Sequence, residues 1–122
     1  MPTARRYPCQ RALRIAARTL HIASAVMVLG AIVFGQEPTA WKWALALSGS
    51  VIMADDLYRY GWAWFRWLQF WAVATKIGLV WLGLVWDAAL EPGHWVALII
   101  GSLISHAPGK WRHYALWGPA AD

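Results

Sequence analysis

Residues 64–86, WFRWLQFWAVATKIGLVWLGLVW, form the longest and most apolar run of the chain. A helix needs about 20 residues to cross the hydrocarbon core of a bilayer, and this run is long enough. Hydrophobic residues make up 60% of the 122-residue chain, and charged residues only 14%. This composition is unlike that of a soluble domain and predicts an integral membrane protein.

Three further apolar runs accompany this one. The four predicted spans cover residues 18–35, 41–58, 64–86 and 93–107. Short connections make successive spans antiparallel neighbours, so we predict one all-α domain, residues 1–122, folded as an up-down-up-down four-helix bundle in the membrane. A basic segment, residues 1–17, precedes the spans, and a tail, residues 108–122, follows them.

The basic residues predict the orientation of the chain. Most of them lie before the first run, between the second and third runs, or after the fourth run. They are Arg5, Arg6, Arg11, Arg14, Arg18, Arg59, Arg66, Lys110 and Arg112. Because connections rich in Lys and Arg stay on the cytoplasmic side, we expect cytoplasmic N- and C-termini. The predicted location is a bacterial-type inner (cytoplasmic) membrane, crossed several times.

The charge balance also bears on the partners. A net charge of +5 would favour nucleic acid as the partner of a soluble chain. Here the cations lie beside the membrane, where topology and anionic lipid headgroups account for them. We therefore predict the lipid bilayer and other membrane protein subunits as partners, and no nucleic acid.

The tryptophans fit the same register of spans. The chain has 11 Trp, and amphipathic indoles collect at the headgroup level of a membrane. Those at the predicted inner boundary are Trp62, Trp64, Trp67, Trp111 and Trp117, and those at the outer one are Trp41, Trp43, Trp86 and Trp95.

Four titratable side chains lie near the predicted cytoplasmic ends of three spans. His21 is in the first span, Asp55 and Asp56 are in the second, and His106 is in the fourth. Since ionisable groups inside a bilayer are costly, they are candidates for function. Their similar depth predicts that His21 and His106 ligate a cofactor, because two imidazoles can supply both axial ligands of a haem b. With Asp55 or Asp56 added, the set suits a divalent transition metal.

A purely structural role would explain the same side chains. Each histidine would hydrogen-bond a neighbour at a helix interface, and Asp55 would pair with Arg59 one helical turn further on. Asp56 would then lie among the headgroups. The sequence leaves these alternatives open.

Lys76 lies near the middle of the third predicted span. Its ammonium group can reach toward the cytoplasmic side along its flexible stem. We expect an anionic partner there, either Asp55 or a propionate of a bound haem. The alternative is that the side chain extends toward the headgroups without a partner.

Two stretches resemble the CopD-like group of small four-span integral membrane proteins, which are similar to copper-resistance and cytochrome b-like modules. In LHIASAVMVLG, residues 20–30, a glycine follows the histidine by nine positions, and in TKIGLVWLGLV, residues 75–85, an apolar run follows a lysine. The resemblance implies that His21 is a ligand or cofactor contact and that Lys76 is a buried charge.

The sequence has no GxGxxG, P-loop, CxxC or HExxH motif and no evident Ser/His/Asp set, so we expect no stand-alone enzyme. The predicted function is an accessory subunit of a larger membrane energy-transducing complex, whether respiratory, photosynthetic or transport. The alternative is an electron-transfer or metal-handling module that binds haem b or a metal through His21 and His106.

Overall fold

The computed structural model describes residues 4–118, and their regular structure is helical. The elements are α1 (Gln10–Val33), α2 (Thr39–Tyr60), the 3-10 helix η1 (Gly61–Arg66), α3 (Leu68–Val85), α4 (Asp87–His106) and α5 (Gly109–Arg112). No strand occurs within these residues, although an isolated antiparallel bridge joins Trp67 to Ala115. The predicted all-α class is therefore confirmed.

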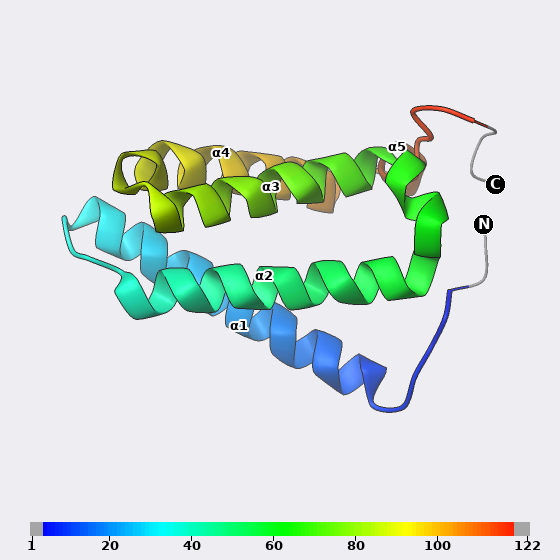
Figure 1. Cartoon of the computed structure of the whole chain (residues 1–122), viewed down its shortest axis with the longest axis horizontal. Helices are drawn as coiled ribbons and strands as arrows, with labels where there is room; N and C mark the ends of the chain where they lie inside the picture. Colours follow the sequence, from blue (N-terminus) through cyan, green and yellow to red (C-terminus); the bar gives the residue numbers. More distant parts are fainter. Residues whose placement is uncertain (1–3, 119–122) are drawn as a thin grey trace.

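The long helices form two antiparallel hairpins, α1–α2 and α3–α4, joined by η1 (Figure 1). The turns within the hairpins lie at one end of the molecule, here named the turn end. The start of α1, η1 and α5 lie at the other end, here named the η1 end (Figure 1). α3 and α4 run side by side, whereas α1 crosses α2 at an angle (Figure 1).

Three helices are long and apolar enough to cross a membrane: α1, α3 and α4. α2 has a similar length, 22 residues, but does not belong to this set. Its charged side chains lower its hydropathy; they are Lys42, Asp55, Asp56 and Arg59. The residues that the structure describes thus contain three candidate spans, and α2 is the exception among the four predicted ones.

The helix boundaries depart from those of the predicted spans. α1 begins at Gln10, inside the predicted basic segment, and α4 begins at Asp87, so that Pro92 lies within this helix. Pro92 is the sixth residue of this helix and has no backbone N–H to donate to the Ala88 carbonyl oxygen, so the helix lacks one intrahelical hydrogen bond there. α3 begins only at Leu68, because Trp67 has an extended backbone with φ −90° and ψ 144°.

Close backbone contact holds the α3–α4 hairpin together. A Cβ atom added to Gly83 would lie 3.1 Å from the Cα atom of Leu90, and one added to Gly93 would lie 3.4 Å from the carbonyl oxygen of Leu79. Small residues at such positions let two helices approach without a side chain between them. The two contacts also give the antiparallel register of the hairpin.

An aromatic core lies at the η1 end. Trp64 and Trp67 are completely buried and pack with Phe70. The C-terminal segment covers this core, since the Leu68 N–H donates to the Tyr114 carbonyl oxygen (2.9 Å). The structure therefore places these two indoles inside the protein, although they belong to the predicted inner boundary. Trp62, from the same group, is exposed.

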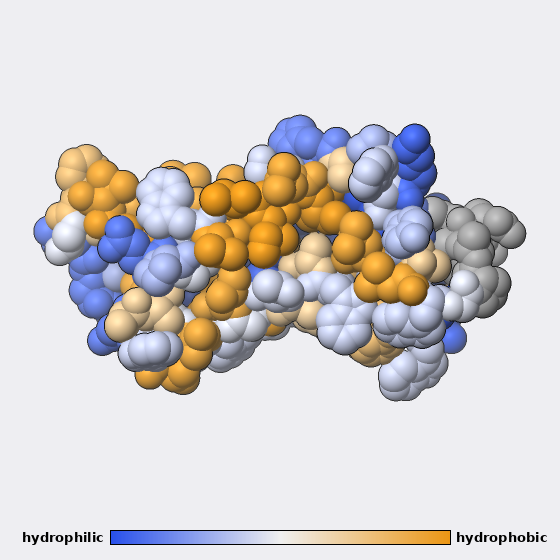
Figure 2. Space-filling view, turned by 90° about the horizontal axis from the view of Figure 1, so that it is seen from above, coloured by the Kyte–Doolittle hydropathy of each residue, from blue (hydrophilic) through white to orange (hydrophobic). Residues whose placement is uncertain are grey.

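Large apolar side chains are exposed on every long helix. The most exposed include Ile22 on α1, Leu47 on α2, Val85 on α3 and Leu103 on α4. Figure 2 shows apolar side chains gathered across the middle of one face of the molecule. Soluble monomers rarely expose apolar patches of large area, so this surface is typical of a protein surrounded by lipid or by partner subunits.

Candidate functional site

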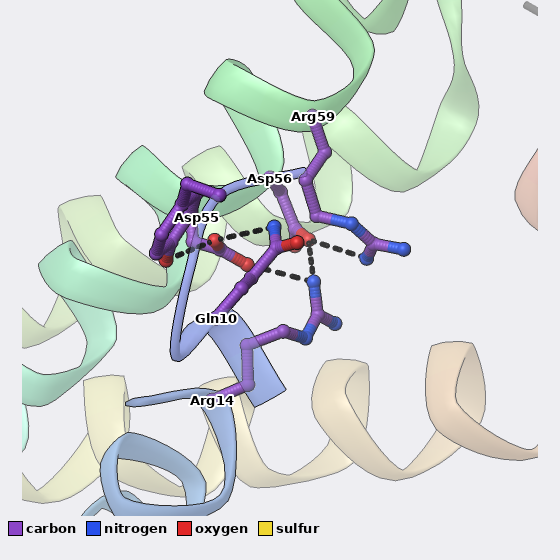
Figure 3. A network of polar contacts seen from close by, with 6 residues as sticks. Gln10, Arg14, Asp55, Asp56 and Arg59 are labelled. Atoms are coloured by element: carbon purple, nitrogen blue, oxygen red, sulfur yellow. Dashed lines mark hydrogen bonds and ion pairs between the residues drawn. The ribbon is translucent and has the colours of Figure 1, made fainter. Parts of the chain in front are cut away.

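The carboxylates of Asp55 and Asp56 are the centre of a polar network at the η1 end (Figure 3). We name this network, made by Tyr7, Gln10, Arg14, Asp55, Asp56 and Arg59, the carboxylate cluster. Both carboxylates are buried. Arg14 Nη1 lies 2.7 Å from Asp55 Oδ2 and 3.4 Å from Asp56 Oδ1, so one guanidinium bridges the two acids.

Neutral donors and a second arginine complete the cluster. The Tyr7 hydroxyl donates to Asp55 Oδ1 (2.7 Å), and Gln10 Nε2 donates to the same oxygen (3.1 Å). The hydrogen bond to Asp55 raises the pKa of the Tyr7 hydroxyl above its ordinary value. Arg59 Nη1 lies 3.8 Å from Asp56 Oδ1. The expected pair of Asp55 with Arg59 is thus replaced by Asp55 with Arg14, and Arg59 faces Asp56 instead.

His21 occupies the interface between α1 and α2. Its Nδ1 atom lies 3.0 Å from Ser48 Oγ, and the Ser48 hydroxyl donates to the Leu45 carbonyl oxygen (3.1 Å). The Ser48 hydroxyl thus lies between the His21 ring and the Leu45 carbonyl oxygen, and the direction of its hydrogen bond with His21 follows the tautomer of the imidazole. A Cβ atom on Gly49 would lie 3.0 Å from His21 Cε1, so glycine is needed there to accommodate the ring.

His106 has a different environment. It is exposed near the end of α4, and its Nδ1 atom lies 2.8 Å from the carbonyl oxygen of Ser102 on the same helix. The partner of His21 is Ser48 on α2, so the two rings belong to separate hydrogen-bonded groups. Within residues 4–118, no group of three or more His, Cys, Asp or Glu side chains could hold a metal ion. The ligand roles of His21, His106, Asp55 and Asp56 stay predictions.

His94 is the functional candidate that the sequence did not reveal. It is buried, and its Nε2 atom lies 3.1 Å from the Ala25 carbonyl oxygen, which links α4 to α1. The structure brings His94 to this position because α4 begins at Asp87, which moves the residue away from the helix end.

Lys76 projects from α3 onto α4. A Cβ atom added to Gly101 would lie 3.0 Å from Lys76 Nζ and 3.2 Å from its Cε, so the stem of the lysine covers this glycine. The expected ion pair of Lys76 with Asp55 is absent, because Asp55 already binds Tyr7, Gln10 and Arg14.

No family model, curated protein or solved structure matches this chain. The resemblance to the CopD-like group therefore stays an interpretation of the two stretches around His21 and Lys76.

Proposed function

We propose that the protein is a multi-pass membrane protein with four spans, in which α2 is the fourth. Two features support this proposal. At about 1.5 Å per residue, the 22 residues of α2 extend for about 33 Å, enough to cross a bilayer. The charged residues of α2 lie near its ends, at Lys42 and from Asp55 to Arg59, and none lies between Lys42 and Asp55.

The proposed orientation places the η1 end on the cytoplasmic side of a bacterial-type inner membrane. Most of the basic residues belong to this end, as the positive-inside rule requires. Labelling with a membrane-impermeant thiol reagent tests it. In intact cells a Thr39→Cys variant should react from outside while Cys9 should not, and the reverse pattern would contradict the orientation.

We further propose that the protein acts as an accessory subunit of a larger membrane energy-transducing complex. The observation that carries this proposal is that several buried polar side chains are satisfied inside the protein while large apolar side chains are exposed on its outside. Buried polar groups such as Asp55, Asp56 and His94 bind partners within the chain, whereas large apolar side chains are exposed on every long helix. Such a surface suits contact with other membrane helices.

Separation of solubilised native membranes by size tests the accessory role. We expect the 13.7 kDa chain to migrate with one respiratory, photosynthetic or transport complex. Deletion of its gene should lower the amount or activity of that complex, and a plasmid copy should restore it. Migration at the mass of the chain alone, with all complexes unchanged after deletion, would contradict the proposal.

The alternative proposal is a haem b or metal-binding module, and the position of the His21 imidazole between α1 and α2, packed on Gly49, favours it. His21 would ligate the group, and His106 is the second ligand predicted from the sequence. Ligation by both rings would require each ring to leave its present surroundings, because His21 packs on Gly49 and His106 faces Ser102 on its own helix. An absorption spectrum with metal analysis tests this, since a Soret band or stoichiometric metal is expected only from the module.

A further inference from the structure

Lys76 is a cation in a candidate span that the described part of the chain does not neutralise. Each acidic side chain of residues 4–118 either forms an ion pair with another cation or lies at the turn end. Asp55 and Asp56 bind Arg14, while Glu37 and Asp87 face Lys42 at the turn end, 2.9 and 3.7 Å from its Nζ atom. Glu91 is exposed in the first turns of α4. No ion pair within these residues includes Lys76.

The ammonium group is directed toward the η1 end. The contacts of Gly83 with Leu90 and of Leu79 with Gly93 place Lys76 opposite the region of Ala97 in the antiparallel hairpin. Its Nζ atom nevertheless lies against Gly101, one helical turn further along α4. At about 1.5 Å per residue this displacement is about 6 Å.

The surface beside this ammonium group is unusually small and polar for a candidate span. Ser102 and Ser105 are exposed on α4, and Thr75 is exposed on α3 next to Lys76. Gly101 and Lys76 are themselves only partly buried. The side chain of Lys76 is thus partly open, and it lies beside exposed serines over which a second helix backbone can approach closely.

We propose that Lys76 and the Gly101–Ser105 face of α4 form a docking site for a transmembrane helix of a partner subunit that carries an Asp or Glu at the depth of Lys76. This inference rests on the proposed accessory role and adds the chemistry of the partner. A carboxylate supplies the charge that Lys76 lacks, and the small residues let the partner helix come near enough for an ion pair.

Two observations favour a helix over an anionic lipid headgroup. Lys76 lies eight residues beyond Leu68, the first residue of α3, so about 12 Å of helix separates it from the η1 end, where a headgroup would lie. A carboxylate on a helix instead arrives from the side, at a fixed depth. In addition, the exposed Ser102 and Ser105 suit backbone approach, which a flexible acyl chain does not need.

Energy transfer in bilayers tests the inference with the full chain and a synthetic peptide. Exposed Cys9, the single cysteine of the chain, takes the donor dye. The probe is a single-span Leu/Ala helix with an acceptor dye and one Glu at mid-depth, and its matched control has Gln there. In phosphatidylcholine vesicles we expect the Glu peptide to associate at least about tenfold more tightly than the Gln peptide.

Variants assign the effect to the site. Lys76→Met should remove the preference for the Glu peptide, and Gly101→Leu should weaken it by obstructing both the ammonium group and the close approach. Lys110→Met is the matched control, because it removes a cation from α5 at the η1 end, outside the candidate spans. This variant should keep the preference for the Glu peptide. Circular dichroism of each variant verifies that its helix content is retained.

Three results would overturn the docking site. One is equal association of the Glu and Gln peptides with the unmodified protein, and another is an undiminished preference in folded Lys76→Met. The third is stabilisation by phosphatidylglycerol that depends on Lys76 and abolishes peptide association, which would assign the site to a lipid headgroup. Because the peptide replaces the native partner, these results are independent of the gene-deletion test of the accessory role.

Discussion

The carboxylate cluster and Lys76 are two places where the protein withdraws charge from water, and their surroundings differ. At the cluster, α1 supplies Gln10 and Arg14 to meet Asp55 and Asp56 from α2. At Lys76, α4 supplies Gly101, which offers space but no opposite charge. The first hairpin therefore neutralises its buried ions internally, whereas the second presents a cation for which the described residues hold no anion.

This difference predicts opposite signs for substitutions at the two places. Removing one member of a buried ion pair leaves the other charge uncompensated, which is strongly destabilising. Removing a cation that has no opposite charge relieves a desolvation cost instead. Measurements of the free energy of unfolding in mixed micelles can compare the two directly.

The largest effect is expected for Arg14→Ala. This change leaves both Asp55 and Asp56 without the guanidinium that bridges them, so the free energy of unfolding should fall by about 3 kcal/mol. The control is Arg11→Ala, which removes an exposed arginine from the same helix and should change stability by less than about 0.5 kcal/mol. Equal effects of the two variants would mean that the cluster does not stabilise the hairpin.

A smaller effect of opposite sign is expected for Lys76→Met in the isolated protein. Methionine keeps much of the stem that packs on Gly101 and removes the charge, so the free energy of unfolding should rise by about 2 kcal/mol. Titration of the unfolding agent with tryptophan fluorescence measures this change. A loss of stability would show instead that Lys76 has a favourable interaction within the isolated chain.

The hydrogen bond between His21 and Ser48 should contribute less to the free energy of unfolding than either charged group. Ser48→Ala removes the hydroxyl that is hydrogen-bonded to His21 Nδ1, and the free energy of unfolding should fall by about 1 kcal/mol. Ser105→Ala, at an exposed position, serves as the comparison. If both serine variants behave alike, the hydrogen bond to His21 adds nothing to the stability of the first hairpin.

The smallest effect concerns the pair of Glu37 and Lys42 at the turn end. The hydrogen bond from Lys42 lowers the pKa of the Glu37 carboxyl below its ordinary value of 4.5. Because this pKa is lower in the folded state, the stabilising contribution is complete above the ordinary value and is lost as the pH falls through the lowered one. Melting temperatures of the unmodified protein and Glu37→Gln should therefore differ slightly at neutral pH and converge in acid. A difference that persists below this range would contradict the assignment.

Apolar runs and turn residues were sufficient to predict four long helices and their antiparallel order. They could not predict the carboxylate cluster, because the basic residues before residue 18 were interpreted only as topology signals. Arg14 reaches Asp55 because α1 extends back to Gln10, and both residues lie at similar distances from the turn between α1 and α2. A longer first helix is thus the information that was missing.

The surroundings of His94 and Trp67 also could not be predicted from the sequence, because they depend on other parts of the chain. α4 starts at Asp87, which places His94 inside the helix and directs its ring to the Ala25 carbonyl oxygen on α1. Trp67 is buried because the C-terminal segment folds back over it. Both depend on contacts between segments far apart in the chain, which hydropathy does not encode.

The bonds between the C-terminal segment and the start of α3 have a consequence for biogenesis. The Leu116 N–H donates to the Arg66 carbonyl oxygen (2.7 Å), so residues near the end of the chain complete the surroundings of residues made much earlier. During synthesis the first hairpin can close its carboxylate cluster once Arg59 has left the ribosome. The aromatic core around Trp67 must wait until Leu116 has emerged, so the η1 end is completed only after all four long helices have been made.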